Sequence, residues 1–210
     1  MTKVNQIIRH DLRNKQQIIS GYLALVLSED KQGEKIPDSL RPFIQKSLEA
    51  SLAIDDLLNM QRDFEEASSR EPEWVSLETL IVRLQRTTEK NIRVGPSTLA
   101  IKIKMSPLYL LLLNLVDNTN RHSNGAREIT ISHRKKEKEF ILIYEDNGVG
   151  VKPEEKKRIF EKGYGRNTGL GLFLIREILE DYNGTIKEVG EHGKGVRFEM
   201  SIPESLCSEN

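Results

Sequence analysis

The chain has 210 residues, of which 37% are hydrophobic, enough for one large domain or two small ones with an ordinary core. Lysine plus arginine equal aspartate plus glutamate at 32 each, and the basic residues are dispersed, so nucleic acid is not an expected partner. The one cysteine, Cys207, excludes a disulfide framework and a cysteine metal site. The sequence has no signal-peptide pattern and no apolar run near the roughly 18 residues that span a bilayer. We expect a cytoplasmic, soluble piece, whose full-length protein could be membrane-anchored.

The first part of the chain has the pattern of two long amphipathic helices. Apolar residues recur on one helical face from about Thr2 to Leu27, and again from about Ser39 to Ala67. The segment from Asp30 to Asp38 carries a glycine and a proline and separates the two helices. Because each apolar stripe of a lone hairpin has only one partner, we expect two copies to pair as a four-helix bundle. Residues 1–68 are therefore predicted to be a homodimerisation domain.

A polar stretch that contains a proline, residues 69–73, predicts a linker to a second domain at 74–203, followed by a frayed tail at 204–210. Short strand patterns in the second domain are expected at Trp74–Ser76, Ala100–Lys104, Ile129–His133, Phe140–Glu145, Thr185–Val189 and Val196–Ile202. Helices are expected at 77–90, 107–123 and 171–183. This order predicts an α+β fold, in which helices cover one face of a mixed, largely antiparallel sheet.

The helix expected at Leu108–His122 is mostly leucine and valine, but it carries a polar stripe. Five polar residues recur at helical spacing on one face: Asn114, Asp117, Asn118, Arg121 and His122. Buried amides and charges are costly unless a partner satisfies them, so we expect a polar ligand. Asparagine and aspartate oxygens suit Mg²⁺, whereas Arg121 and His122 suit phosphate oxygens. The stripe indicates a metal–nucleotide site, and the alternative is a solvated outer face.

Two glycine clusters follow. Asp146 ends an apolar strand pattern and is followed by Gly148 and Gly150. Its carboxylate can accept a hydrogen bond from an exocyclic amine, and the glycines allow a flat ring to approach the backbone. The alternative is an ordinary turn. The second cluster precedes a helix, where backbone amides form a site for a di- or triphosphate; its members are Gly163, Gly165, Gly169 and Gly171. Lys162 and Arg166 are expected to close over the phosphates as part of a lid. The alternative is a mobile loop with solvated charges.

The order of these motifs carries a resemblance. Along the chain come Asn114 to Asn118, Asp146-x-Gly148-x-Gly150, Ile159-Phe160, Gly169-Leu170-Gly171-Leu172 and Gly193-x-Gly195. From about Trp74 to Pro203 the chain resembles the catalytic ATP-binding domain of sensor histidine kinases, within the group that includes gyrase, Hsp90 and MutL. The resemblance implies ATP and Mg²⁺ as cofactors. The chain differs from the family in three ways. Asn167 occupies a position where the family usually has a glycine, and the lid is short. Val196 occupies a position where the family often has a threonine, whose hydroxyl would lie near the base.

The resemblance also implies a role for each matched residue. Asn118 would bind Mg²⁺ with Asn114 beside it, Arg121 and His122 would touch phosphates, and Asp146 would accept from the adenine amine. The segment from about Gly150 to Gly169, with Lys162 and Arg166, would be the ATP lid. The remaining pocket residues implied are Gly148, Gly150, Gly169, Leu170, Gly171 and Leu172.

The first helix carries the sequence His10-Asp11-Leu12-Arg13-Asn14. His10 falls about 180° from the apolar face, with Asn14 one turn away, so both are expected to face outward. An outward imidazole is a usable nucleophile, Asp11 can hold the other ring N–H or accept a proton, and Asn14 can orient a phosphate or a water. The alternative is a surface histidine without a role.

Ahead of the ATP domain, His-Asp-x-x-Asn resembles the phosphoacceptor box of sensor histidine kinases. The resemblance implies that His10 takes the γ-phosphoryl group and passes it to an aspartate of a response regulator, with Asp11 as the base. Asn14 would position phosphate and, in many members, the water that dephosphorylates the regulator. Lys15 replaces a frequent proline. Only nine residues precede His10, so we expect the helix to continue upstream into a sensor domain.

Two other functions remain open from the sequence. One is a phosphotransfer scaffold with weak ATPase activity, built on the same dimeric hairpin. The other is a serine-directed kinase or an ATPase on the same nucleotide-binding fold, which makes no use of His10. A gyrase-type ATPase is expected to carry a glutamate at the start of its asparagine helix, where this chain has Asn114.

Overall fold

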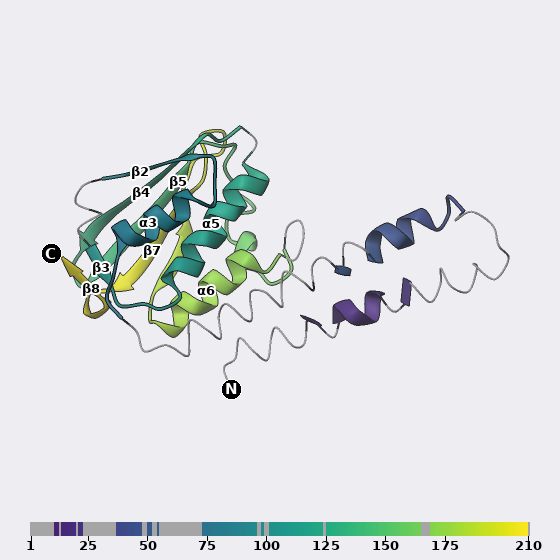
Figure 1. Cartoon of the computed structure of the whole chain (residues 1–210), viewed down its shortest axis with the longest axis horizontal. Helices are drawn as coiled ribbons and strands as arrows, with labels where there is room; N and C mark the ends of the chain where they lie inside the picture. The colour runs from purple at the N-terminus through teal and green to yellow at the C-terminus, as the bar shows by residue number, and fades with distance from the viewer. Residues whose placement is uncertain are drawn as a thin grey trace. The chain divides into compact units, whose positions relative to one another are not determined.

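The structure is a computed structural model (Figure 1). It describes residues 11–12, 14–19, 21–22, 37–47, 50–51, 54, 73–95, 98, 101–123, 125–164 and 169–209. The chain divides into two compact units, residues 1–66 and 67–210. Over the described ranges, no helix has the length and apolar character needed to cross a membrane.

The second unit contains a five-stranded mixed sheet with the strand order β2-β4-β5-β7-β6. β2 runs parallel to β4, and every other neighbouring pair is antiparallel. The largely antiparallel sheet predicted from the sequence is therefore confirmed, although β2 was not predicted. The strand bounds are β2 Asn91–Val94, β4 Glu128–Lys136, β5 Glu139–Asp146, β6 Thr185–Glu188 and β7 Arg197–Pro203.

The same unit contains a smaller sheet of three antiparallel strands, which includes the last described residues of the chain. Its order is β1 (Val75–Ser76), β3 (Ile101–Ile103) and β8 (Cys207–Glu209), with a short helix η3 (Glu204–Leu206) before β8. The expectation of a frayed tail from residue 204 is wrong, because β8 pairs with β3 and the Cys207 side chain is buried. Chain-end residues become ordered when a strand ties them into a sheet.

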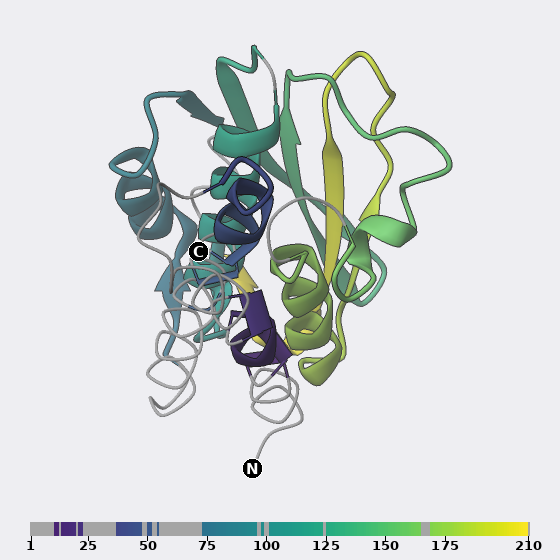
Figure 2. The same ribbon diagram turned by 90° about the vertical axis from the view of Figure 1, so that its right-hand side faces the viewer.

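Among the described residues of this unit, three helices cover one face of the large sheet, as the two layers in Figure 2 show. They are α3 (Leu77–Gln85), α5 (Leu108–His122) and α6 (Gly171–Asp181), and α5 contacts both of the others. α3 begins where the Ser76 hydroxyl accepts from the backbone N–H of Thr79 at 3.2 Å, a serine N-cap. A short helix, η2 (Arg158–Phe160), places the Phe160 ring edge-on to Phe198 of β7.

The core lies between the helices and the sheet. Alternate residues of β5 point toward the helices, so that Phe140, Leu142 and Tyr144 are almost fully buried opposite Ile202, Met200 and Phe198 of β7. On β4, the buried residues Ile129 and Ile131 point to the same face and complete this layer. α5 and the end of β5 are thus fixed against each other by packing.

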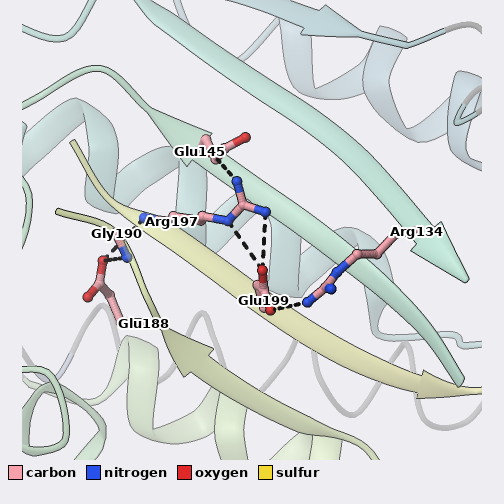
Figure 3. A network of polar contacts seen from close by, with 6 residues as sticks. All are labelled: Arg134, Glu145, Glu188, Gly190, Arg197 and Glu199. Atoms are coloured by element: carbon pink, nitrogen blue, oxygen red, sulfur yellow. Dashed lines mark hydrogen bonds and ion pairs between the residues drawn. The ribbon is translucent and has the colours of Figure 1, made fainter. Parts of the chain in front are cut away.

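Charged side chains of the described strands lie on the opposite face of the sheet. Arg197 bonds Glu145 at 2.8 Å and Glu199 at 3.1 Å, and Arg134 bonds Glu199 at 2.7 Å (Figure 3). Burial opposes ionisation of Glu199, but the hydrogen bonds from Arg134 and Arg197 outweigh it and lower the pKa of this carboxyl. This network shields Ile141, which is buried on the same face.

The described residues of the first unit are helical at 11–12, 14–19, 21–22, 41–47, 50–51 and 54. The rings of Tyr22 and Phe43 lie 5.5 Å apart, so these two segments touch. Leu40 and Ile54 are buried, whereas Asn14 is exposed and Asp11 is half-buried. His10 lies outside the described residues. The complete hairpin and its pairing into a dimeric bundle stay predictions.

Candidate functional site

The polar stripe predicted on α5 is present, and its residues are in different states. Asn114 donates from Nδ2 to the carbonyl of Leu110 at 3.0 Å. Asn118 is half-buried, and its Nδ2 is buried with no hydrogen-bond partner in the described structure. Asp117 and Arg121 form an ion pair at 2.8 Å, with each side chain nearly half exposed. The side chain of His122 lies outside the described part. A buried amide without a partner is rare and calls for a ligand.

The first residue of α6 faces this stripe. A Cβ added to Gly171 would lie 3.6 Å from Asn114 Oδ1 and 3.9 Å from Asn118 Nδ2. The first backbone N–H groups of a helix have no partner within the helix, and together with the helix dipole they favour an anion. No side chain caps this end, which follows the buried Leu170, and Leu172 is half-buried in the first turn. The side-chain amides of Asn114 and Asn118 thus stand beside the N-terminal end of α6.

Asp146 lies at the end of β5 with 7% of its surface exposed. Its Oδ1 accepts from the backbone N–H of Gly148 at 2.9 Å and of Val196 at 3.2 Å. Its Oδ2 accepts from the hydroxyl of Thr119 on α5 at 2.8 Å. Hydrogen bonds to a charged acceptor are the strong ones, so this carboxylate is held firmly in one orientation.

The glycines near Asp146 allow close backbone packing. A Cβ at Gly148 would lie 2.5 Å from Ser123 Cβ, and one at Gly150, where φ is +71°, would lie 2.6 Å from the carbonyl oxygen of Gly195. A Cβ at Gly195, where φ is +112°, would lie 1.8 Å from the carbonyl oxygen of Asp146. Besides the room for a ring expected from the sequence, these glycines let the turn after β5 and the β6–β7 loop pack against each other.

The predicted lid is described only in part. Lys162 is exposed, and Arg166 lies outside the described residues. The two described ends of the loop meet where Gly163 N–H donates to the carbonyl of Gly169 at 3.1 Å, and Gly169 has a φ of +59°. The Tyr164 hydroxyl donates to Glu155 at 3.0 Å. The loop thus begins and ends at one place, directly before α6.

Two buried groups near Asp146 were not predicted from the sequence. Thr119, 2% exposed, bonds both Asp146 and the hydroxyl of Tyr144, the latter at 2.8 Å. Thr119 follows Asn118 of the polar stripe directly, and a threonine inside a helix gives no sequence signal of a functional role. The Glu188 side chain is fully buried and pairs at 2.9 Å with Lys156, from the segment before η2. The sequence contained a signal for the burial of Glu188: it lies two residues after Ile186, and alternate residues of a strand point to the same face.

Glu188 fastens the β6–β7 loop. Its Oε1 accepts from the backbone N–H of Gly190 at 2.9 Å and of Arg197 at 3.2 Å. Lys156 also donates from Nζ to the carbonyl of Gly190. The neighbouring Val196 is the residue whose N–H reaches Asp146. The pair therefore stabilises the loop that supports the Asp146 carboxylate.

Comparisons with known proteins agree with this arrangement. Residues 104–206 match the family described as histidine kinase-, DNA gyrase B- and HSP90-like ATPase. The sensor protein SrrB of Staphylococcus aureus strain N315 is 26% identical to the chain over 94% of its length. The chain spans 37% of the length of SrrB.

Solved structures of histidine kinases share the fold. The Acinetobacter baumannii histidine kinase AdeS is 20% identical, with a TM-score of 0.59, and the match covers 93% of this chain and 98% of AdeS. Full-length ShkA in complex with AMPPNP is 18% identical, with a TM-score of 0.57 over 96% of this chain and 46% of ShkA. Within the second unit, residues 104–206 thus match the histidine kinase-, DNA gyrase B- and HSP90-like ATPase family, and the chain shares its fold with solved histidine kinases.

Proposed function

We propose that this chain is the core of a sensor histidine kinase that phosphorylates itself on His10 with ATP and passes the phosphoryl group to an aspartate of a response regulator. The observation that carries the proposal is the unpartnered amide of Asn118 beside Gly171 at the start of α6. A metal-bound triphosphate is the ligand class that uses both amide oxygens and helix N-terminal amides.

The residues at this place fit Mg²⁺-ATP. Mg²⁺ prefers oxygen ligands, and if Asn118 offers Oδ1 to the metal, its Nδ2, which is buried without a partner in the described structure, would donate to a phosphate oxygen. Asn114 lies one helical turn away. When bound, Mg²⁺ neutralises charge on the β- and γ-phosphates. Because a Cβ at Gly171 would stand between α6 and these two amides, a glycine there leaves room for a phosphate.

Other residues would hold the rest of the nucleotide. Arg121 would turn from its ion pair with Asp117 toward a phosphate, an exchange between exposed groups that costs little. We assign His122, Lys162 and Arg166 to the phosphates as well. Asp146 would accept from the adenine amine. The pocket wall would be formed by Gly148, Gly150, Gly169, Leu170, Gly171 and Leu172.

The transfer needs few chemical groups. A nitrogen of the His10 imidazole would attack the γ-phosphorus as the bond to the β–γ bridging oxygen breaks, so that ADP leaves and Asp11 accepts the ring proton. A carboxylate of the response regulator would then take the phosphoryl group from the imidazole. Asn14, exposed on its helix, would position the phosphate and the water of a regulator phosphatase reaction.

The same proposal covers assembly. Residues 1–68 would pair two copies as a four-helix bundle, which buries the second apolar stripe of each hairpin. The chain spans 37% of the sensor protein SrrB, which supports a sensor region outside this chain. The core would work in the cytoplasm, where ATP and the regulator are available.

Incubation with γ-labelled ATP and Mg²⁺ tests the proposal. Phosphohistidine is labile in acid and stable in base, so wild-type label should follow that pattern and vanish in His10→Ala. His192→Ala, at an exposed histidine of the β6–β7 loop, is the matched control and should label normally. ATP binding without any label would favour the phosphotransfer scaffold, whereas acid-stable label that survives His10→Ala would favour a serine-directed kinase.

A further inference from the structure

A chain of three buried groups ends at the proposed adenine acceptor. Tyr144 is fully buried on β5, Thr119 is 2% exposed on α5, and Asp146 is 7% exposed at the end of β5. The hydroxyl oxygens of Tyr144 and Thr119 lie 2.8 Å apart, and the Thr119 hydroxyl lies 2.8 Å from Asp146 Oδ2. Each of the three side chains is therefore fixed by packing and by its neighbour.

The direction of the hydrogen bonds follows from the chemistry of the groups. A carboxylate only accepts, so the single hydroxyl proton of Thr119 is donated to Asp146. The oxygen of Thr119 must then accept from Tyr144. Burial raises the pKa of Tyr144 above its usual value, so its hydroxyl keeps the proton that it donates. The protons thus point one way, from Tyr144 through Thr119 to Asp146.

The donors of the described residues leave Asp146 one acceptor position. A carboxylate has about four lone-pair sites, and three are used by Thr119, Gly148 and Val196. The fourth can accept from an exocyclic N–H of a ligand. A ring that presents a carbonyl oxygen at this place would bring two acceptors together, which is unfavourable in a buried site.

We propose that Thr119 and Tyr144 are positioning residues that hold Asp146 as a fixed acceptor and thereby select 6-amino purine nucleotides over 6-oxo purine nucleotides. The inference rests on the proposed role of Asp146 in binding the base. Val196 contributes its backbone N–H to the same carboxylate, and the hydroxyl donor comes from Thr119 of α5.

The test compares ATP with purine riboside triphosphate, which lacks the exocyclic amine, and with GTP, each titrated calorimetrically with Mg²⁺. Thr119→Val removes the hydroxyl at nearly constant shape. We expect its Kd for ATP to rise about 10-fold, as for loss of a hydrogen bond to a charged group, while its Kd for purine riboside triphosphate changes less than about two-fold. The preference for ATP over GTP should shrink.

Two further variants keep the proposal testable if Thr119→Val does not fold. Thr119→Ser retains the hydroxyl and should restore the wild-type preference. Tyr144→Phe should shift it in the same direction as Thr119→Val but less, and the double variant should not add the two effects, because both act through one bond. Thr185→Val is the matched control, since its hydroxyl bonds Ser201 at 2.9 Å on the other face of the sheet.

The outcomes separate this inference from the proposed function. Equal losses for ATP and purine riboside triphosphate in Thr119→Val and Tyr144→Phe would mean a structural role and would overturn the inference. So would an unchanged ATP preference in both variants while the wild type prefers ATP. A wild-type protein that binds both nucleotides equally would instead remove the role of Asp146, and the inference with it.

Discussion

Gly193 and Gly195 offer a sharp test of the packing behind Asp146. Both lie in the β6–β7 loop with positive φ, +91° and +112°, so an alanine at either place is strained by roughly 1–3 kcal/mol. Only Gly195 lacks space. Its added Cβ would lie 1.8 Å from the carbonyl oxygen of Asp146 and would have to move about 1.6 Å to reach an ordinary contact of 3.4 Å, whereas at Gly193 nothing lies within 4 Å.

The two alanine variants should therefore differ. Overpacking typically adds about 1–3 kcal/mol, so Gly195→Ala should lose more unfolding free energy than Gly193→Ala by this amount in urea. The shift also displaces Asp146 relative to Val196, whose N–H is a donor at 3.2 Å. Loss of a charge-assisted hydrogen bond, about 1.5–3 kcal/mol, corresponds to at least about 10-fold weaker ATP binding. Gly193→Ala should bind ATP within about two-fold of wild type. Equal stability and equal ATP affinity in the two variants would refute the reasoning.

Two further predictions concern the buried side chains of Glu188 and Cys207. Lys156→Met leaves the buried Glu188 carboxylate without its cation and should lower the unfolding free energy by about 3–5 kcal/mol in urea denaturation. The exposed control Lys157→Met should change the unfolding free energy by less than about 0.5 kcal/mol. Similar values for the two variants would contradict a buried ion pair. Burial, with the charge of Glu204, raises the pKa of Cys207 to about 12, so the thiol should react with maleimide at pH 8 far more slowly in the folded than in the urea-unfolded protein. Because only the unfolded thiol ionises between its ordinary pKa of 9.0 and about 12, this group should also destabilise the fold as pH rises through that interval. Rapid labelling of the folded chain would mean that β8 is not docked on β3.

The sequence predicted elements that have a strong local pattern. α5 combines a leucine-rich surface with a polar stripe at helical spacing, and β5 is an apolar run bounded by turn residues, so the structure has both close to the expected bounds. β2 was missed because its four residues alternate weakly and its parallel partner β4 follows only after α5. β8 was missed because its burial depends on β3, about a hundred residues earlier.

The candidate site divides in the same way. Asn114, Asn118 and Asp146 could be predicted, because polar residues in an apolar helix or at a strand end stand out in a sequence. Thr119 could not, since a threonine in a helix is unremarkable until the fold brings it 2.8 Å from Asp146. The backbone packing of Gly195 on Asp146 was likewise hidden, because it joins positions that are far apart in the chain.

The most direct test of the central claim is a calorimetric titration of ATP with and without Mg²⁺ into wild type, Asn118→Ala and Asn120→Ala. Asn120 is the matched control, an exposed amide on the same helix that bonds Thr88 at 2.8 Å. We predict that Mg²⁺ strengthens ATP binding to wild type and to Asn120→Ala, and that this gain disappears in Asn118→Ala. An undiminished gain from Mg²⁺ in Asn118→Ala would contradict the assignment of the α5 stripe as the metal–nucleotide site.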